Sequence, residues 1–218
     1  MSDVSGVRVD ASEQARSGAS RGGRPRDPAL DESIIKATRR RLVLDGYSAM
    51  SLGDIAADAG VSRPTIYRRW ANKLELTIDA LDWGFRRQQD SYPPAPFEDM
   101  PAREAFTEAV RRVDPSYFNP DAMVLMGNFM GEALRTPELL DHLKERAVEP
   151  RVRLVEQVLA GLQDRGEVRR DLDRHTVATL CFGAYYSAFL RGEHRRGGLA
   201  EEVVAVLWPA IAWSDSAP

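Results

Sequence analysis

One short segment of the chain, residues 63–69, gathers side chains that can bind a polyanion. Guanidinium and hydroxyl groups hydrogen-bond both to phosphate oxygens and to base edges in a DNA major groove. The segment supplies such groups at Arg63, Thr65, Tyr67, Arg68 and Arg69. Ile66, the apolar residue among them, would face inward on a helix. The pattern therefore indicates a short helix that presents polar groups outward.

The residues before this segment predict another short helix and a tight turn. Ser51 can cap a helix over 52–59, Gly60 can supply a left-handed turn, and Ser62 can cap the next helix. Pro64 suits the first turn of that second helix, which should run to about residue 70. The buried side of the pair is apolar at Leu52, Ile55, Ala56, Val61 and Ile66. This is the arrangement of a helix-turn-helix, although an ordinary helical hairpin shares the bare pattern.

The rest of the chain predicts an all-α fold, because apolar residues recur at three and four positions without sustained two-residue alternation. The proline-rich stretch 92–97 cannot be helical and should separate two domains. Pro150 and Pro209 should kink or split the helices that contain them. Helices are expected over 28–45, 73–89 (capped by Asn72), 101–113, 120–135, 137–164, 172–191 and 199–212.

Composition excludes several classes of protein. The chain has 218 residues, 43% of them hydrophobic and 29% charged, which is typical of a globular protein. Cys181 is the single cysteine, and the three histidines are too widely spaced for a metal motif. No phosphate-binding loop or nucleophile elbow occurs, so we expect neither an enzyme nor a cofactor nor a metal. No apolar run approaches the roughly 18 residues of a membrane span, so we expect a soluble, cytoplasmic protein without a membrane partner.

Charge is distributed unevenly along the chain. Residues 21–73 carry 11 lysines and arginines against six acidic residues, whereas the whole chain has a net charge of −3. A basic N-terminal part on an acidic remainder indicates a head that binds a polyanion. An RNA-binding module would also be basic, but the segment resembles no known RNA-binding motif and lacks a platform of stacking aromatics.

Residues 21–81 resemble the TetR-like (tetracycline-repressor-like) transcriptional regulators. The similarity lies in RGGRPR at 21–26 and in the stretch ESIIKATRRRLVLDGYSAMSLGDIAADAGVSRPTIYRRWANKLELTIDAL. It implies a three-helix DNA-binding domain at 24–72, a connecting helix at 73–90, and a helical ligand-binding and dimerisation domain at 91–218. Residues 1–23 are rich in Ser, Gly, Ala and Arg and are expected to be a disordered basic tail.

The resemblance also implies roles for individual residues. Arg63, Pro64, Thr65 and Arg69 match positions that contact bases, whereas Ser51, Tyr67 and Lys73 match contacts to the DNA backbone; Arg68 is expected beside them. Gly53 stands where some members contact a base, which puts that contact in doubt. Arg21, Arg24 and Arg26 resemble an arm that enters a minor groove, with a solvated tail as the alternative. Arg39 and Arg41 replace residues that are often aliphatic; they are expected on a solvated face, with a contact to phosphate as the alternative.

The C-terminal part should hold a largely apolar small-molecule effector. Methionines and aromatic residues suit an adaptable apolar cavity, although such residues also form ordinary core. The helices over 172–191 and 199–212 are apolar nearly all round, which favours a homodimer that reads two half-sites of a DNA operator. A module that binds nucleic acid or protein without ligand control is the alternative. The candidate ligand residues are Trp83, Phe106, Met123, Met126, Phe129, Met130 and Tyr185.

Overall fold

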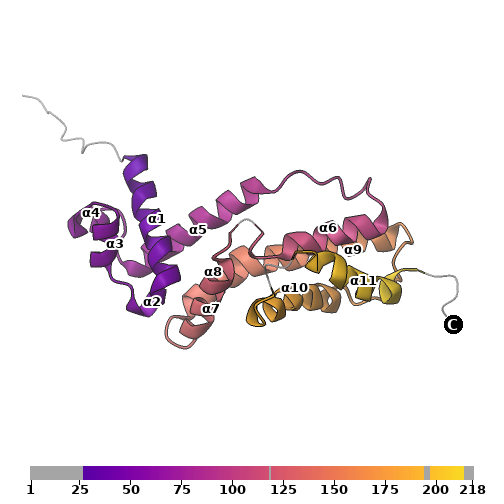
Figure 1. Cartoon of the computed structure of the whole chain (residues 1–218). Helices are drawn as coiled ribbons and strands as arrows, with labels where there is room; N and C mark the ends of the chain where they lie inside the picture. The colour runs from indigo at the N-terminus through magenta and orange to yellow at the C-terminus, as the bar shows by residue number, and fades with distance from the viewer. Residues whose placement is uncertain (1–26, 118, 194–196, 214–218) are drawn as a thin grey trace, which may run out of the picture.

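The computed structural model describes residues 27–117, 119–193 and 197–213, and these residues form an α-helical protein in two parts (Figure 1). Helices α1 to α4 form a head at one end, and α6 to α11 form an elongated body. Helix α5, Lys73–Ser91, connects the two parts. The described residues contain a single β-bridge, between Val168 and Ala212, and no strand. None of the described helices is both long enough and apolar enough to span a membrane.

The helices of the head begin and end where short-range signals place them. Asp27 accepts a hydrogen bond from the Ala29 amide at the start of α1, Pro28–Leu44. Gly46, at a φ of +73°, allows the turn into α2, Gly46–Ala49, a helix that the sequence analysis did not predict. Helix α3 spans Leu52–Asp58 and α4 spans Arg63–Tyr67. Gly60 lies between them at a φ of +66°, as the turn prediction required.

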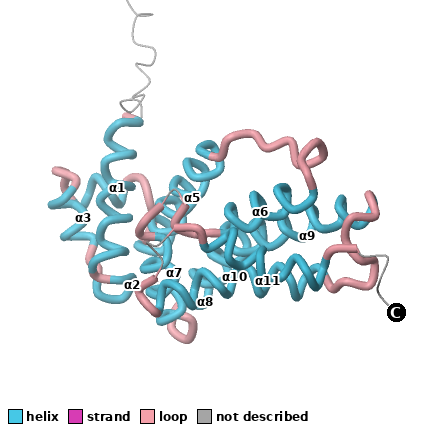
Figure 2. Tube along the Cα trace, turned by 45° about the vertical axis from the view of Figure 1, so that its right-hand side comes forward, coloured by secondary structure: helices cyan, strands magenta, loops and turns pink. Residues whose placement is uncertain are grey.

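The body begins after an extended loop of residues 92–101, which Figure 2 shows arching away from the end of α5. The prediction that this stretch is not helical is therefore confirmed. Helix α6, Ala102–Val113, packs against α9, Glu149–Asp164, and α11, Leu199–Ile211, while α10, Arg174–Leu190, packs against α9. These four helices share one hydrophobic cluster, which includes Phe106 and Leu159.

The chain between α6 and α9 forms two helices and a turn of π-helix. Helix α7 spans Ala122–Glu132 and α8 spans Pro137–Leu143. A turn of π-helix, η1, covers Lys144–Val148 and leads into α9. Pro150 has no N–H to donate and crowds the preceding turn, which explains why the predicted 137–164 helix is split here. The prediction that Pro209 splits the last helix is wrong. Helix α11 continues through Pro209 to Ile211.

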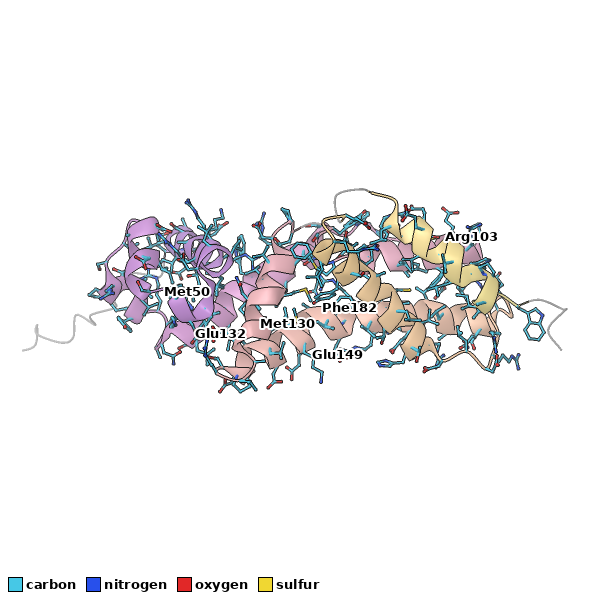
Figure 3. The ribbon with its side chains drawn as sticks, turned by 60° about the horizontal axis from the view of Figure 1, so that its bottom comes forward. Met50, Arg103, Met130, Glu132, Glu149 and Phe182 are labelled. Carbon is cyan, nitrogen blue, oxygen red and sulfur yellow. The ribbon has the colours of Figure 1, made fainter. Side chains whose placement is uncertain are left out.

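A second hydrophobic cluster joins the head to α5, α7 and α8. Met126 and Phe129 of α7 belong to the same buried cluster as Ile34 of α1 and Leu76 of α5. Two hydrogen bonds reinforce the contact: Asn128 donates to the Leu42 carbonyl at 2.7 Å, and the Ser48 amide donates to buried Glu132 at 3.2 Å. Figure 3 shows Glu132 next to the head, near Met50, the residue that follows α2. A shift of α7 would therefore act directly on the head.

Candidate DNA interface and ligand cavity

Helix α4 presents most of the sequence-predicted DNA contacts on one open surface. Arg63, Pro64, Tyr67 and Arg68 are exposed, and the Tyr67 side chain is 56% exposed. Ile66 is buried on the opposite side, as predicted. Neither Arg63 nor Arg68 forms an ion pair within the described part of the chain. Both guanidinium groups can therefore bind an anion without breaking an existing ion pair.

Gly53 gives Arg63 the space that it occupies. A Cβ atom at Gly53 would lie 2.6 Å from Nη2 of Arg63, closer than real Cβ contacts come. The Arg63 side chain therefore lies across α3 at the position where a family member with a longer residue would present its own side chain. The position of the Arg63 side chain thus depends on the absence of a side chain at residue 53, a link that the sequence alone did not reveal.

The hydroxyl groups near the start of α3 and α4 are already hydrogen-bonded. Ser51 caps α3 as predicted, because its Oγ accepts from the Asp54 amide at 3.1 Å. Ser62 lies at the corresponding position of α4 but does not cap it; its Oγ is 2.9 Å from Oγ1 of Thr65 instead. Thr65 Oγ1 also accepts from Nη2 of Arg68 at 3.0 Å. Thr65 and Arg68 therefore hold each other in place on the α4 surface.

Two predicted DNA contacts, Arg69 and Lys73, are engaged inside the head. Arg69 pairs with Asp31 of α1 and donates to the Thr65 carbonyl at 3.2 Å. The ammonium of Lys73 donates to the carbonyls of Tyr47 and Met50, at 2.8 and 3.3 Å. Partial burial lowers the pKa of Lys73. Their DNA contacts remain predictions, as do those of Arg24 and Arg26, which lie outside the described residues.

The expectation of a solvated face is wrong for Arg39, whereas Arg41 is partly exposed but forms ion pairs at the surface. Nη1 of Arg39 donates to the Ala80 carbonyl at 3.1 Å, and burial lowers its pKa. Gly84 leaves room for this guanidinium on α5. Arg41 clamps α1 to α3 through two hydrogen bonds to Asp58, at 2.7 and 2.8 Å. Arg39 therefore joins α1 to α5 and Arg41 joins α1 to α3, because their long side chains reach polar groups on neighbouring helices.

A cavity of about 240 Å³ lies between α5, α6, η1 and the start of α9. Phe85, Pro150 and Leu154 provide apolar wall. The polar wall includes Gln88, which is buried and donates to the Tyr92 hydroxyl at 3.3 Å. Three arginines also line the cavity: Arg112, Arg146 and Arg151. The cavity therefore combines apolar surface with cationic groups.

None of the sequence-predicted ligand residues lines this cavity. Phe106, Met126 and Phe129 are core residues, Met130 is half-exposed, and the Trp83 ring lies against the cationic groups of Lys36, Arg39 and Arg87. Met123 and Tyr185 line a second cavity of about 330 Å³, where the Tyr185 hydroxyl donates to the Val110 carbonyl at 3.0 Å. Their contacts with a ligand remain predictions.

Sequence reasoning missed the arginines of the cavity. Arg112 had a readable signal, because it occupies the buried side of α6 together with Ala105, Ala109 and Val113. A charged residue at a core position of a helix calls for a partner or a ligand. Arg151 had no such signal, since its environment depends on where the tertiary structure places η1 and Tyr92 around it.

Family models and individual relatives match this chain over most of its described length. Residues 34–80 match the model of bacterial regulatory proteins, tetR family, and residues 101–207 match that of the tetracyclin repressor-like C-terminal domain. An uncharacterized HTH-type transcriptional regulator of Mycobacterium tuberculosis is 30% identical over 149 residues, or 66% of this chain and 70% of the relative. The DNA-binding transcriptional repressor TetR of Mycobacteroides abscessus is 33% identical over 131 residues, or 46% of this chain and 69% of the relative.

Solved structures share the fold at lower identity. A TetR-family regulator from Mesorhizobium loti is 20% identical, with a TM-score of 0.67 over 85% of this chain and 98% of its own. A regulator from Saccharomonospora viridis in complex with choline is 19% identical, with a TM-score of 0.66 over 86% of this chain and all of its own. Bacillus subtilis FadR in complex with stearoyl-CoA is 17% identical, with a TM-score of 0.61 over 81% and 96% of the two chains.

Proposed function

This chain belongs to the tetR family of bacterial regulatory proteins, and we propose that it is a ligand-responsive, sequence-specific DNA-binding regulator. In this proposal it represses transcription from a palindromic operator until a small molecule releases it. One observation carries the proposal: α5 has its first residue, Lys73, in the head and its residues Phe85, Gln88 and Gln89 in the wall of the cavity.

The head supplies the DNA contacts. Arg63 and Thr65 would reach base edges, while Tyr67, Arg68 and Lys73 would bind phosphates, because these groups cluster at α4 and the start of α5. Arg69 would add a contact only after its ion pair with Asp31 opens. Lys73 likewise has to leave the carbonyls of Tyr47 and Met50, or reach a phosphate through a remaining N–H.

Two copies of the chain would present two heads to the operator. Helices α10 and α11 leave large apolar side chains open in the single chain: Leu180 is 55% exposed, Leu190 is 82% exposed and Val206 is 77% exposed. A second copy would bury them in an interface built from the same two helices of each subunit. Half-sites about 34–36 Å apart require two heads at a fixed distance.

Ligand control follows if the ligand prefers the released conformation. A ligand in the cavity contacts α5 directly, and α5 packs along α1 of the head. The ligand shifts the equilibrium only by its difference in affinity between the two conformations. The solved relatives with choline and with stearoyl-CoA support a small-molecule effector in this architecture, and their ligands differ widely in chemistry.

Selection of bound duplexes from a random DNA pool at physiological salt tests the DNA-binding part. We expect a palindromic motif with fixed half-site spacing. A double variant, Arg63→Ala with Arg68→Ala, serves as control and should enrich no motif. Binding that declines smoothly with salt and enriches no motif, with and without candidate ligands, would contradict the proposal. Release of the selected duplex by a small molecule then tests ligand control.

A further inference from the structure

Arg151 is the cationic group of the cavity that lacks an anionic partner. Arg112 pairs with Glu108, its Nε lying 2.8 Å from a carboxylate oxygen, and donates to the Pro93 carbonyl at 2.6 Å. Arg146 pairs with Asp82 at 3.1 Å. Arg151 forms no ion pair with any residue that the structure describes. Its Nη1 donates to the Ala147 carbonyl of η1, and its side chain also hydrogen-bonds with Tyr92.

The Nε–H of Arg151 is buried and has no acceptor within the described residues. Burial is the largest influence on this guanidinium and lowers its pKa, and Tyr92 and Asp114 offset part of that effect. Leaving a buried donor of a charged group without an acceptor costs free energy. A native protein tolerates this where a ligand supplies the missing acceptor.

We propose that Arg151 binds the anionic group of a small carboxylic acid whose apolar body lies against Phe85, Pro150 and Leu154. This inference rests on the proposed function, since it names the chemical class of the effector. The fork of N–H groups on a guanidinium matches the two oxygens of a carboxylate. Arg112 and Arg146 already contact the carboxylates of Glu108 and Asp82. The charge of Asp114 acts on Arg151 without forming an ion pair with it, so Arg151 is the cavity arginine open to an added anion.

The size of the cavity sets the size of the apolar body. Its volume of about 240 Å³ exceeds the roughly 150 Å³ of a cavity that admits benzene. A single aromatic ring or a short aliphatic chain therefore fits together with its carboxylate. The negative net charge of the chain does not prevent an anion from binding in the cavity. Arg151 lies in the cavity wall, whereas distant surface charges are screened by salt.

A comparison of isosteric ligands with different charge tests the proposal without DNA. Benzoate, benzamide and benzylamine, and likewise hexanoate, hexanamide and hexylamine, are titrated into the full chain by calorimetry up to millimolar concentrations. We expect the carboxylate of at least one series to bind about tenfold or more tightly than its amide, the factor expected of a charge-assisted hydrogen bond. The amine should bind most weakly.

Two matched variants locate the charge. Arg151→Gln should remove the preference for the carboxylate, whereas Arg153→Gln, on the exposed side of the same helix, should keep it. Arg151→Lys keeps the charge but loses the fork, so it should retain part of the preference. Circular dichroism checks that each variant folds. If Arg151→Gln does not fold, the ratio of carboxylate affinity to amide affinity in the unmodified chain still tests the proposal.

Each other outcome overturns the proposal. These outcomes are equal binding of carboxylate and amide, tighter binding of an amine, a preference that survives Arg151→Gln, and no binding in either series. The proposed regulator is judged separately, by whether a DNA motif is selected. Carboxylate binding without a selected DNA motif would support the cavity assignment and contradict the proposed regulator function. A selected motif without carboxylate binding would support the regulator function and contradict the cavity assignment.

Discussion

Arg63 and Arg68 of the head and Arg151 of the cavity form no ion pair in the described structure, but their side chains lie in different environments. Arg63 and Arg68 are exposed on α4, and water hydrates their charges. Arg151 lines a partly open cavity, and one of its N–H groups is buried without an acceptor among the described residues. Exposure lets an arginine remain unpaired at little cost, whereas burial makes an unpaired guanidinium expensive.

This difference indicates two kinds of anion. A row of exposed cations suits a long polyanion, whose affinity comes from many contacts and from the release of counterions. One partly buried cation with apolar neighbours suits a single small anion that it desolvates. Arg41 of the head is a third case, since Asp58 neutralises it and its role is to hold two helices together.

The largest expected contrast is in salt dependence. Operator affinity should fall roughly a thousandfold or more between about 50 and 200 mM salt, because several phosphate contacts release counterions. Carboxylate affinity for the cavity should fall by less than about tenfold, because a buried pair is weakly screened. Anisotropy titrations with the selected duplex and calorimetry with the carboxylate measure the two slopes. Equal slopes would remove the distinction between the two sites.

Arg63→Ala should change which sequence is preferred. Removal of a contact with a base edge is expected to lower discrimination at one base position of each half-site by about 1–3 kcal/mol. Arg103→Ala, which removes an exposed arginine of α6, should change neither affinity nor preference. Competition titrations with operators altered one position at a time give the result. An equal loss of affinity on all sequences would show that Arg63 binds phosphate instead.

Lys73 and Tyr67 should separate DNA binding from stability. Lys73→Met removes two hydrogen bonds to backbone carbonyls, so the free energy of unfolding should fall by about 1 kcal/mol in addition to a loss of affinity for all duplexes. Tyr67→Phe should weaken binding alone, because Tyr67 is exposed and no hydrogen bond of its hydroxyl occurs within the described structure. Urea unfolding and DNA titration of both variants test this. Unchanged stability of Lys73→Met would show that the hydrogen bonds from Lys73 to the Tyr47 and Met50 carbonyls do not stabilise the fold.

The smallest expected effect is on the pH dependence of stability and comes from the ion pair between Arg41 and Asp58. Arg41 lowers the pKa of Asp58 below its ordinary value of 3.8, so the pair stabilises the fold above that value and loses its contribution as pH falls through the lower folded-state pKa. Arg41→Met should make thermal stability less dependent on pH in this acid range, and Asp58→Asn should do the same. The double variant should add little to either single change. An unaltered pH profile in both would show that the pair contributes no stability.

Much of the head could be predicted from sequence because its signals act over a few residues. The cap at Ser51, the positive φ of Gly60 and the inward side of Ile66 each depend on neighbours within one or two turns of chain. Helix α2 escaped prediction because four residues carry no periodicity. The fates of Arg39 and Arg41 also escaped, since their partners, Ala80 and Asp58, lie 41 and 17 residues away.

The body could be predicted as helical but its cavity could not. Met126 and Phe129 have the composition of an adaptable pocket, yet they form core with the head because α7 packs there. By itself, the sequence determined the all-α class, the turn chemistry of the head and the cationic residues of α4. Only the tertiary structure decided that Arg63 lies over Gly53 and that Arg151 is left unpaired in a cavity, because both depend on contacts between helices that local propensity does not encode.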